Sequence, residues 1–143
     1  MEMISEHTGI ASAGVLAAEL LVEACEAGDG LHLETVRDLA KDLGRGLSSL
    51  SAAGTTDSLV EATIACADLA TLAACNVVAL PDRGRPPAAA ATHLAAGTAR
   101  ALAALAEAEI GDPEDAHAEN VLRDAGSAGW KADLAVRQIG EAG

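Results

Sequence analysis

The chain has 143 residues, a mass of 14.2 kDa and a formal charge of −13 at pH 7, from 22 acidic and 9 basic residues. Ala accounts for 35 residues, Phe and Tyr are absent, and Trp130 is the one aromatic side chain. β-Sandwiches and barrels, which need β-branched and aromatic residues, are disfavoured. Collagen-like and disordered chains are excluded because half of the residues are hydrophobic. We therefore predict a single all-α domain spanning residues 1–143.

The negative charge also limits the partners of the chain. A phosphate backbone and an anionic membrane surface would both be repelled, so we expect neither nucleic acid nor a membrane as a partner. The cysteines are odd in number, and the first residues are acidic where a secretory signal peptide is basic. These features predict a reducing, cytoplasmic location.

Gly, Pro and polar clusters divide the chain into five helical segments with short connections. The expected segments are 6–27, 31–51, 58–80, 88–110 and 113–139. The first two place apolar residues at three- and four-residue intervals on one face and charged residues on another. Short connections make neighbouring helices antiparallel, so we predict an up-and-down bundle of about five helices.

Particular residues predict where the helices begin. Thr56 or Asp57 is expected to cap the third helix, and the proline-rich loop before the fourth helix is expected to exclude both of its neighbours. Asp112 is expected to cap the fifth helix, with Pro113 at the first helical position, where a missing N–H costs nothing. Two glycines inside that helix, Gly126 and Gly129, predict close packing of a neighbouring helix.

The third and fourth segments are the most apolar, and each approaches the length that spans a bilayer. Asp68 interrupts the third, and His93 and Arg100 interrupt the fourth. Because a central Asp or Arg costs about 2.5–3.5 kcal/mol on insertion, we reject membrane spanning. We interpret the two segments as a central hairpin buried on most sides, in part by a second subunit, and expect a homodimer.

Polar side chains inside these apolar runs are the candidates for chemistry. If the hairpin turns near residues 83–84, Cys75 lies opposite His93 and Asp68 lies opposite Arg100, at two levels about two turns apart. Asp68, His93 and Cys75 are then candidate catalytic groups, as an acid–base carboxylate and a thiol–imidazole pair. The alternative is that Asp68 and Arg100 form an ion pair that fixes helix register, and that Cys75 and His93 are ordinary core residues.

Signatures of metals and cofactors are sparse in the sequence. A closed metal site needs three or four ligands, and Cys66 is the one further thiol near Cys75 and His93. Glu114 and His117 have the spacing of half of a di-iron site, but the sequence has no second copy of this motif. The common nucleotide-binding and hydrolase motifs are also missing from the sequence, so we expect no cofactor and no metal.

The stretch 120–137 resembles the last conserved segment of the cyclodeaminase/cyclohydrolase helical family, in which an Asn, a short gap and Asp-Ala-Gly precede an Ala-rich helix. The matching positions are Asn120, Asp124, Ala125 and Gly126. This resemblance implies an all-helical dimer that acts on folate-bound one-carbon groups at its subunit interface.

Three interpretations remain open. The first is a small enzyme or ligand-binding protein that acts on a polar small molecule by acid–base chemistry, as a cofactor-independent lyase, hydrolase or cyclase. Its pocket would lie between the third, fourth and fifth helices, with Arg100, His117, Asn120 and Asp124 as ligand-binding residues. The second is a non-catalytic oligomeric module whose Ala-rich faces bind a partner helix. The third is a metal-binding bundle of the four-helix type.

Overall fold

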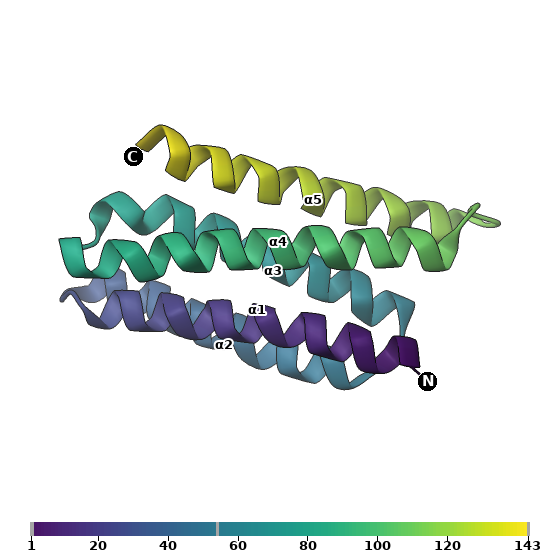
Figure 1. The fold of residues 1–143 in the computed structure, drawn as a ribbon, viewed down its shortest axis with the longest axis horizontal. Helices are drawn as coiled ribbons and strands as arrows, with labels where there is room; N and C mark the ends of the chain where they lie inside the picture. The colour runs from purple at the N-terminus through teal and green to yellow at the C-terminus, as the bar shows by residue number, and fades with distance from the viewer. Residues whose placement is uncertain (1, 54, 143) are drawn as a thin grey trace.

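The computed structural model describes the backbone of residues 2–53 and 55–142 and the side chains of residues 10, 12–50 and 55–140. The described residues form five α-helices and two short 3₁₀ helices, with no strand, so the predicted all-α bundle is confirmed (Figure 1). The elements are α1 (Glu2–Glu26), α2 (Leu31–Ala53), α3 (Thr56–Asn76), η1 (Val77–Ala79), η2 (Asp82–Gly84), α4 (Arg85–Ile110) and α5 (Ala116–Ala142).

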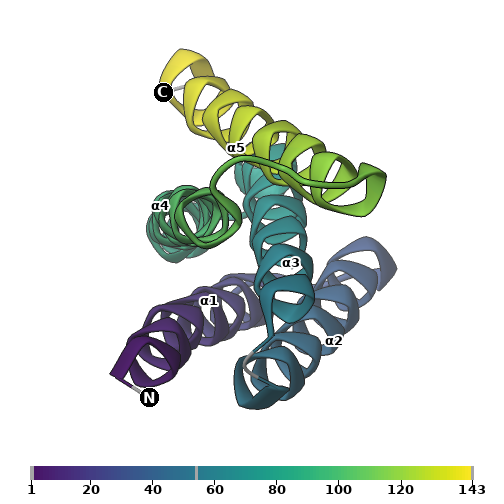
Figure 2. The ribbon, with the colours of Figure 1, turned by 90° about the vertical axis from the view of Figure 1, so that its right-hand side faces the viewer.

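The helices stack in three layers (Figure 2). α1 and α2 form one layer, α3 and α4 form the middle layer, and α5 lies alone on the far side, packed against both α3 and α4. The interior consists mostly of Ala side chains, with a few fully buried leucines such as Leu21, Leu69 and Leu102 between them. Because no further helix of the described chain covers α5, its outer side faces solvent along its length.

The start of α3 differs from the prediction. Thr55 is the N-cap, and neither Thr56 nor Asp57 takes this position. The Thr55 hydroxyl accepts a hydrogen bond from the Ser58 amide at 3.0 Å, and the Ser58 hydroxyl accepts one from the Thr55 amide at 2.9 Å. This reciprocal capping box satisfies two amides at once, which explains why the cap lies one residue earlier than expected.

The start of α5 also differs. The helix begins at Ala116, and the predicted cap, Asp112, lies in the connection before it. Asp115 caps the helix instead, because its carboxylate accepts a hydrogen bond from the Ala118 amide at 2.8 Å. Both aspartates are suitable cap residues, and the structure uses the second, so that Pro113 stays outside the helix.

The connection between α3 and α4 lies earlier in the chain than predicted, at residues 77–84 instead of 81–87, and the prediction that neither helix enters the proline-rich stretch is wrong. α3 ends at Asn76 and the chain continues as η1 to Ala79, after which Leu80 is extended because it precedes Pro81. α4 begins at Arg85 and includes Pro86 and Pro87 in its first turn. Amides in a first turn have no helical partner, so prolines are tolerated there.

Close helix packing occurs at a different glycine from those predicted. A Cβ built on Gly14 of α1 would lie 2.8 Å from Cys66 Sγ of α3. A Cβ on Gly126 or Gly129 would meet no neighbouring atom within 4 Å, so within one chain the predicted close packing of a neighbouring helix does not occur there. The reason is orientation: Gly126 is exposed and Gly129 half-buried, and neither is turned into the α3–α4 junction.

The segment Thr56–Ala79 is the one part of the described chain that is long and apolar enough to cross a membrane. Half of its most apolar stretch is buried inside the bundle. A core helix has the same composition, because it is covered by other helices on several sides.

Candidate functional site

Asp68 lies where α3 meets α5. Its carboxylate accepts a hydrogen bond from the Lys131 ammonium at 2.6 Å, and both side chains are about half exposed. Asp124 and Ser127 of α5 line the same groove, which has a volume of about 240 Å³. Two of the predicted site residues, Asp68 and Asp124, therefore lie together, and Lys131 adds a charge that the sequence did not single out.

The predicted pair of Asp68 and Arg100 is wrong. Arg100 of α4 donates a hydrogen bond to Asp133 of α5 at 3.1 Å. Since α5 packs over the junction of α3 and α4, it lies between the two side chains and supplies a partner to each. Lys131 and Asp133 belong to the same turn of α5, so Asp68 and Arg100 do lie at one level of the bundle, but on opposite flanks of α5.

The predicted pair of Cys75 and His93 is wrong for the same reason. The exposed Cys75 Sγ lies 3.8 Å from Nε2 and 3.9 Å from Oε1 of Gln138, on α5. His93 is exposed on α4 and has no hydrogen-bond partner among the described side chains. The thiol–imidazole pair that the sequence predicted is therefore not formed among the described side chains.

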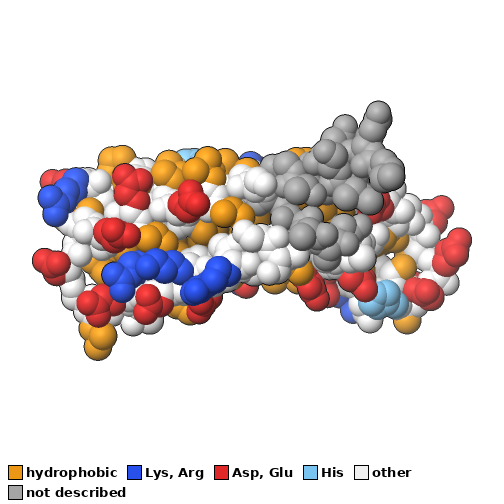
Figure 3. All heavy atoms as spheres, turned by 90° about the horizontal axis from the view of Figure 1, so that it is seen from below, with side chains coloured by type: hydrophobic (Ala, Val, Ile, Leu, Met, Phe, Trp, Pro, Cys, Tyr) orange, Lys and Arg blue, Asp and Glu red, His pale blue; other side chains and the backbone are white. Residues whose placement is uncertain are grey.

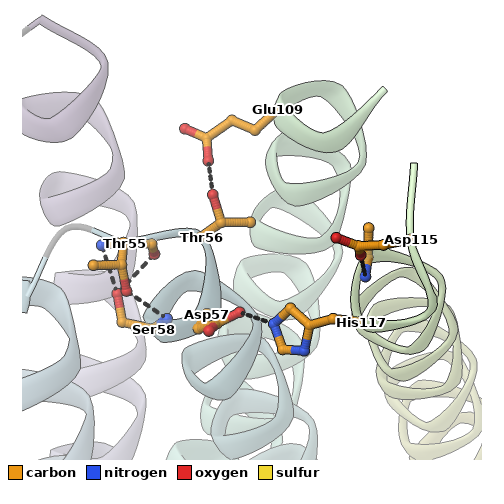
Figure 4. A network of polar contacts seen from close by, with 8 residues as sticks. Thr55, Thr56, Asp57, Ser58, Glu109, Asp115 and His117 are labelled. Atoms are coloured by element: carbon orange, nitrogen blue, oxygen red, sulfur yellow. Dashed lines mark hydrogen bonds and ion pairs between the residues drawn. The ribbon is translucent and has the colours of Figure 1, made fainter. Parts of the chain in front are cut away.

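His117 lies at the end of the bundle where α3 begins and α4 ends (Figure 4). Its Nε2 is 3.1 Å from Asp57 Oδ1, which makes an exposed ion pair when the imidazole is protonated. Beside it, the Thr56 hydroxyl donates a hydrogen bond to Glu109 at 3.0 Å. These contacts connect the ends of three helices and leave His117 on the surface.

The residues that carry the cyclodeaminase resemblance do not share one site. Asp124 lines the groove between α3 and α5. Asn120 is exposed and accepts a long hydrogen bond, 3.4 Å, from Arg123 of its own helix. Gly126 is exposed and faces solvent.

The two buried thiols, Cys25 and Cys66, have raised pKa values. Burial raises the pKa of Cys66 from 9.0 to about 12. Burial also raises the pKa of Cys25, and the positive charge of Arg37 opposes part of this rise. Both thiols are therefore protonated at neutral pH, in the form that is neither a nucleophile nor a metal ligand. Among the side chains that the structure describes, no three His, Cys, Asp or Glu residues lie close enough together to hold a metal ion.

A wider groove of about 390 Å³ lies between α1 and α2, away from all the predicted site residues. Small and branched apolar side chains form its floor, and charged ones form its edges. The lining residues are Val15, Ala18, Glu19, Val22, Ala40, Lys41, Gly44, Arg45 and Ser48. In Figure 3, Lys and Arg side chains lie beside an exposed strip of hydrophobic side chains on this face. In the sequence this groove is marked only by Lys41 and Arg45, which lie one turn apart beside Ala40 and Gly44, and charged residues in this pattern also occur on ordinary solvated helix faces.

Comparisons of the chain with family models, curated proteins and solved structures found no match. Three of the seven predicted site residues form an ion pair with a side chain on a different helix, and each of these pairs involves α5. Asp68 pairs with Lys131, Arg100 pairs with Asp133, and His117 pairs with Asp57 when its imidazole is protonated.

Proposed function

We propose that the protein is a non-catalytic helix-bundle module that works by associating with protein chains, first of all with copies of itself. The observation that carries this proposal is the position of Trp130. The one aromatic residue of the chain is 65% exposed, on the outer side of α5. Leu134, one turn later, is 39% exposed beside it. Exposed apolar side chains that gather on a surface mark interaction sites, and Trp is enriched at the energetic centres of protein interfaces.

The polar residues support the same proposal. An acid or base in catalysis must reach a proton on its substrate, usually from a site that shields it from water. Asp68 is instead neutralised by Lys131 at 2.6 Å on a half-exposed helix flank. Arg100 is held by Asp133, and His117 by Asp57. Side chains arranged in this way fix the position of α5, which presents Trp130.

Native mass spectrometry combined with sedimentation velocity tests the proposal. We expect a species with the mass of a whole number of chains and no retained small molecule, and we expect it to dissociate on dilution. A protein that stays monomeric from nanomolar to high micromolar concentration would contradict self-association. Replacing Asp68 with Asn is the control, because loss of a surface ion pair should leave the association constant unchanged.

A second candidate is the binding of a polar small molecule in the groove between α3 and α5, with acid–base chemistry of the cyclodeaminase type. The observation that favours it is the meeting of Asp68, Asp124 and Lys131 around one groove. Opposite charges that converge in a groove suit a zwitterionic or amide-containing ligand. The native mass spectra also distinguish the two candidate functions. A small organic molecule that is retained by the unchanged protein and lost in Asp68→Asn would favour ligand binding over the interaction module.

A further inference from the structure

The outer side of α5 carries an ordered stripe of side chains. Successive members are four, three, four, three and four residues apart, which places them on one face of the helix. We call this stripe the α5 outer face; it consists of Glu119, Arg123, Gly126, Trp130, Asp133 and Arg137. All of them are exposed except Asp133, which is half-buried beside Arg100. The face runs along the helix that lies alone in its layer (Figure 2).

Gly126 is unexplained by the fold of a single chain. Its backbone does not have a positive φ, and a Cβ there would meet no neighbouring atom within 4 Å. A glycine inside a helix is destabilising compared with alanine, because it loses more backbone entropy on folding. It lies one turn before the exposed Trp130 on the same face of α5, and the space above it is open. A space of that kind suits a large side chain that comes from outside the chain.

The order of residues on the α5 outer face is complementary to its own reverse. When the face is laid against a second copy running in the opposite direction, Glu119 lies opposite Arg137, Arg123 opposite Asp133, and Trp130 opposite Gly126. Each of these pairs occurs twice, once in each direction. A parallel arrangement in register would place every charge against its like. Complementarity between a surface and its own reverse is what a two-fold interface requires.

We infer that two copies of the chain associate through the α5 outer face about a two-fold axis, with Trp130 of each copy packed on Gly126 of the other. This inference rests on the proposed function and specifies its partner and its interface. The charge of the molecule agrees with it. Although the chain carries −13 overall, α5 holds three of its nine Lys and Arg residues, so this helix opposes close approach of two copies less than the rest of the surface.

The pair of Glu119 and Arg137 is the most informative to change. Neither side chain forms an ion pair or side-chain hydrogen bond among the described residues, so both are available to a second copy. Asp133 is less suitable, because it already binds Arg100, and in the dimer it would be shared between Arg100 and Arg123 of the second copy.

A charge exchange measured by sedimentation velocity tests the pairing. We expect Glu119→Arg to weaken dimerisation about tenfold, since two like-charge contacts replace two ion pairs. Arg137→Glu should have the same effect. The double variant Glu119→Arg/Arg137→Glu should return the dissociation constant to near that of the unchanged protein, because both pairs are restored in reverse. Single variants that leave the dissociation constant unchanged, or a double variant that does not recover, would overturn the antiparallel interface.

Gly126→Ala provides a second test that separates folding from association. The added methyl group should raise the thermal unfolding midpoint, yet weaken dimerisation about tenfold by displacing the indole of the second copy. Gly46→Ala is the matched control: Gly46 is an exposed helical glycine with open space around it, on α2 in the opposite layer. It should raise the midpoint and leave dimerisation unchanged.

Trp130 is itself the probe of the interface, because it is the one Trp in a chain without Tyr or Phe. Its fluorescence emission should shift to shorter wavelength as the dimer forms, and in Glu119→Arg the same shift should require about tenfold higher protein concentration. A dimer in which Trp130 stays solvent-exposed would overturn this interface while leaving the proposed function intact. A protein that never dimerises would overturn both.

Discussion

Two helical glycines show that the inner and outer parts of this bundle use small residues differently. A Cβ on Gly14 would lie 2.8 Å from Cys66 Sγ and 3.1 Å from a methyl group of Leu47, whereas a Cβ on Gly126 would meet nothing within 4 Å. The packing of α1 against α2 and α3 requires the first glycine, and nothing inside the chain requires the second. Substitutions should therefore affect mainly folding in the inner region and mainly association in the outer one.

The largest effect should come from the inner region. Leu47 is fully buried beside Gly14, and Leu47→Ala should lower the free energy of unfolding by about 2–5 kcal/mol, through lost burial and the cavity that remains. Urea denaturation followed by circular dichroism measures this loss. Leu39→Ala on the same helix is the matched control, since Leu39 is 48% exposed and should cost less than about 1 kcal/mol. Equal losses at the two positions would contradict the described core.

Gly14→Ala tests the comparison directly. The new methyl group has no room beside Cys66 and Leu47, so the free energy of unfolding should fall by about 1–3 kcal/mol. Gly126→Ala should raise the free energy of unfolding of the monomer by about 0.5–1 kcal/mol, because alanine favours the helix and no contact within the chain is lost. Combining Gly14→Ala with Cys66→Ala should recover part of the loss, and a strictly additive double variant would show that the two residues do not touch.

The helices could be predicted from the sequence because the signals that begin and end a helix lie within a few residues of its ends. Glycines, prolines and capping side chains act within a few residues, so all five helices were found and the errors were limited to short shifts at their ends, as with Asp115 in place of Asp112. The contacts between helices were not predictable in this way. The prediction that α3 and α4 lie side by side is confirmed, but the predicted pair of Asp68 and Arg100 across their hairpin is wrong. α5 packs over the junction of both helices and supplies Lys131 to Asp68 and Asp133 to Arg100.

The candidate functional residues show the same limit. Polar residues inside apolar runs indicated positions at helix interfaces, and Asp68 and Arg100 do lie there. The pattern could not tell whether such a residue lines a closed pocket or a solvated flank, because that depends on how far the next helix covers it. The α5 outer face was present in the sequence as a stripe with four- and three-residue steps, but its meaning depends on the structural finding that no helix covers it.

The stability of the inner region should also depend on pH. Burial raises the pKa of Cys66 from 9.0 to about 12, so the folded protein keeps this proton at pH values where the unfolded chain has lost it. The contribution of this proton to the free energy of unfolding is complete below pH 9. As the pH rises from 9 toward 12, the free energy of unfolding falls by about 1.4 kcal/mol per pH unit. The measurement is the free energy of unfolding at pH 8, about 9.5 and about 10.5 for the unchanged protein and for Cys66→Ala. If both lose stability at the same rate, Cys66 is not the group responsible.

The smallest effect should come from the ion pair between Asp68 and Lys131 on the flank of α5. Both side chains are about half exposed, so a double-mutant cycle with Asp68→Asn and Lys131→Gln should give a coupling energy of about 0.2–1 kcal/mol that falls as salt is added. A coupling of several kcal/mol that persists in high salt would mean that the pair is desolvated, as in a closed pocket, and would favour the ligand-binding candidate. The ion pair of Asp42 and Arg45 is the control, because it lies within α2 at 2.7 Å and joins no second helix. The coupling energy of this exposed pair should be of the same size and should fall in the same way with added salt, so a larger, salt-resistant coupling between Asp68 and Lys131 would come from the groove between α3 and α5.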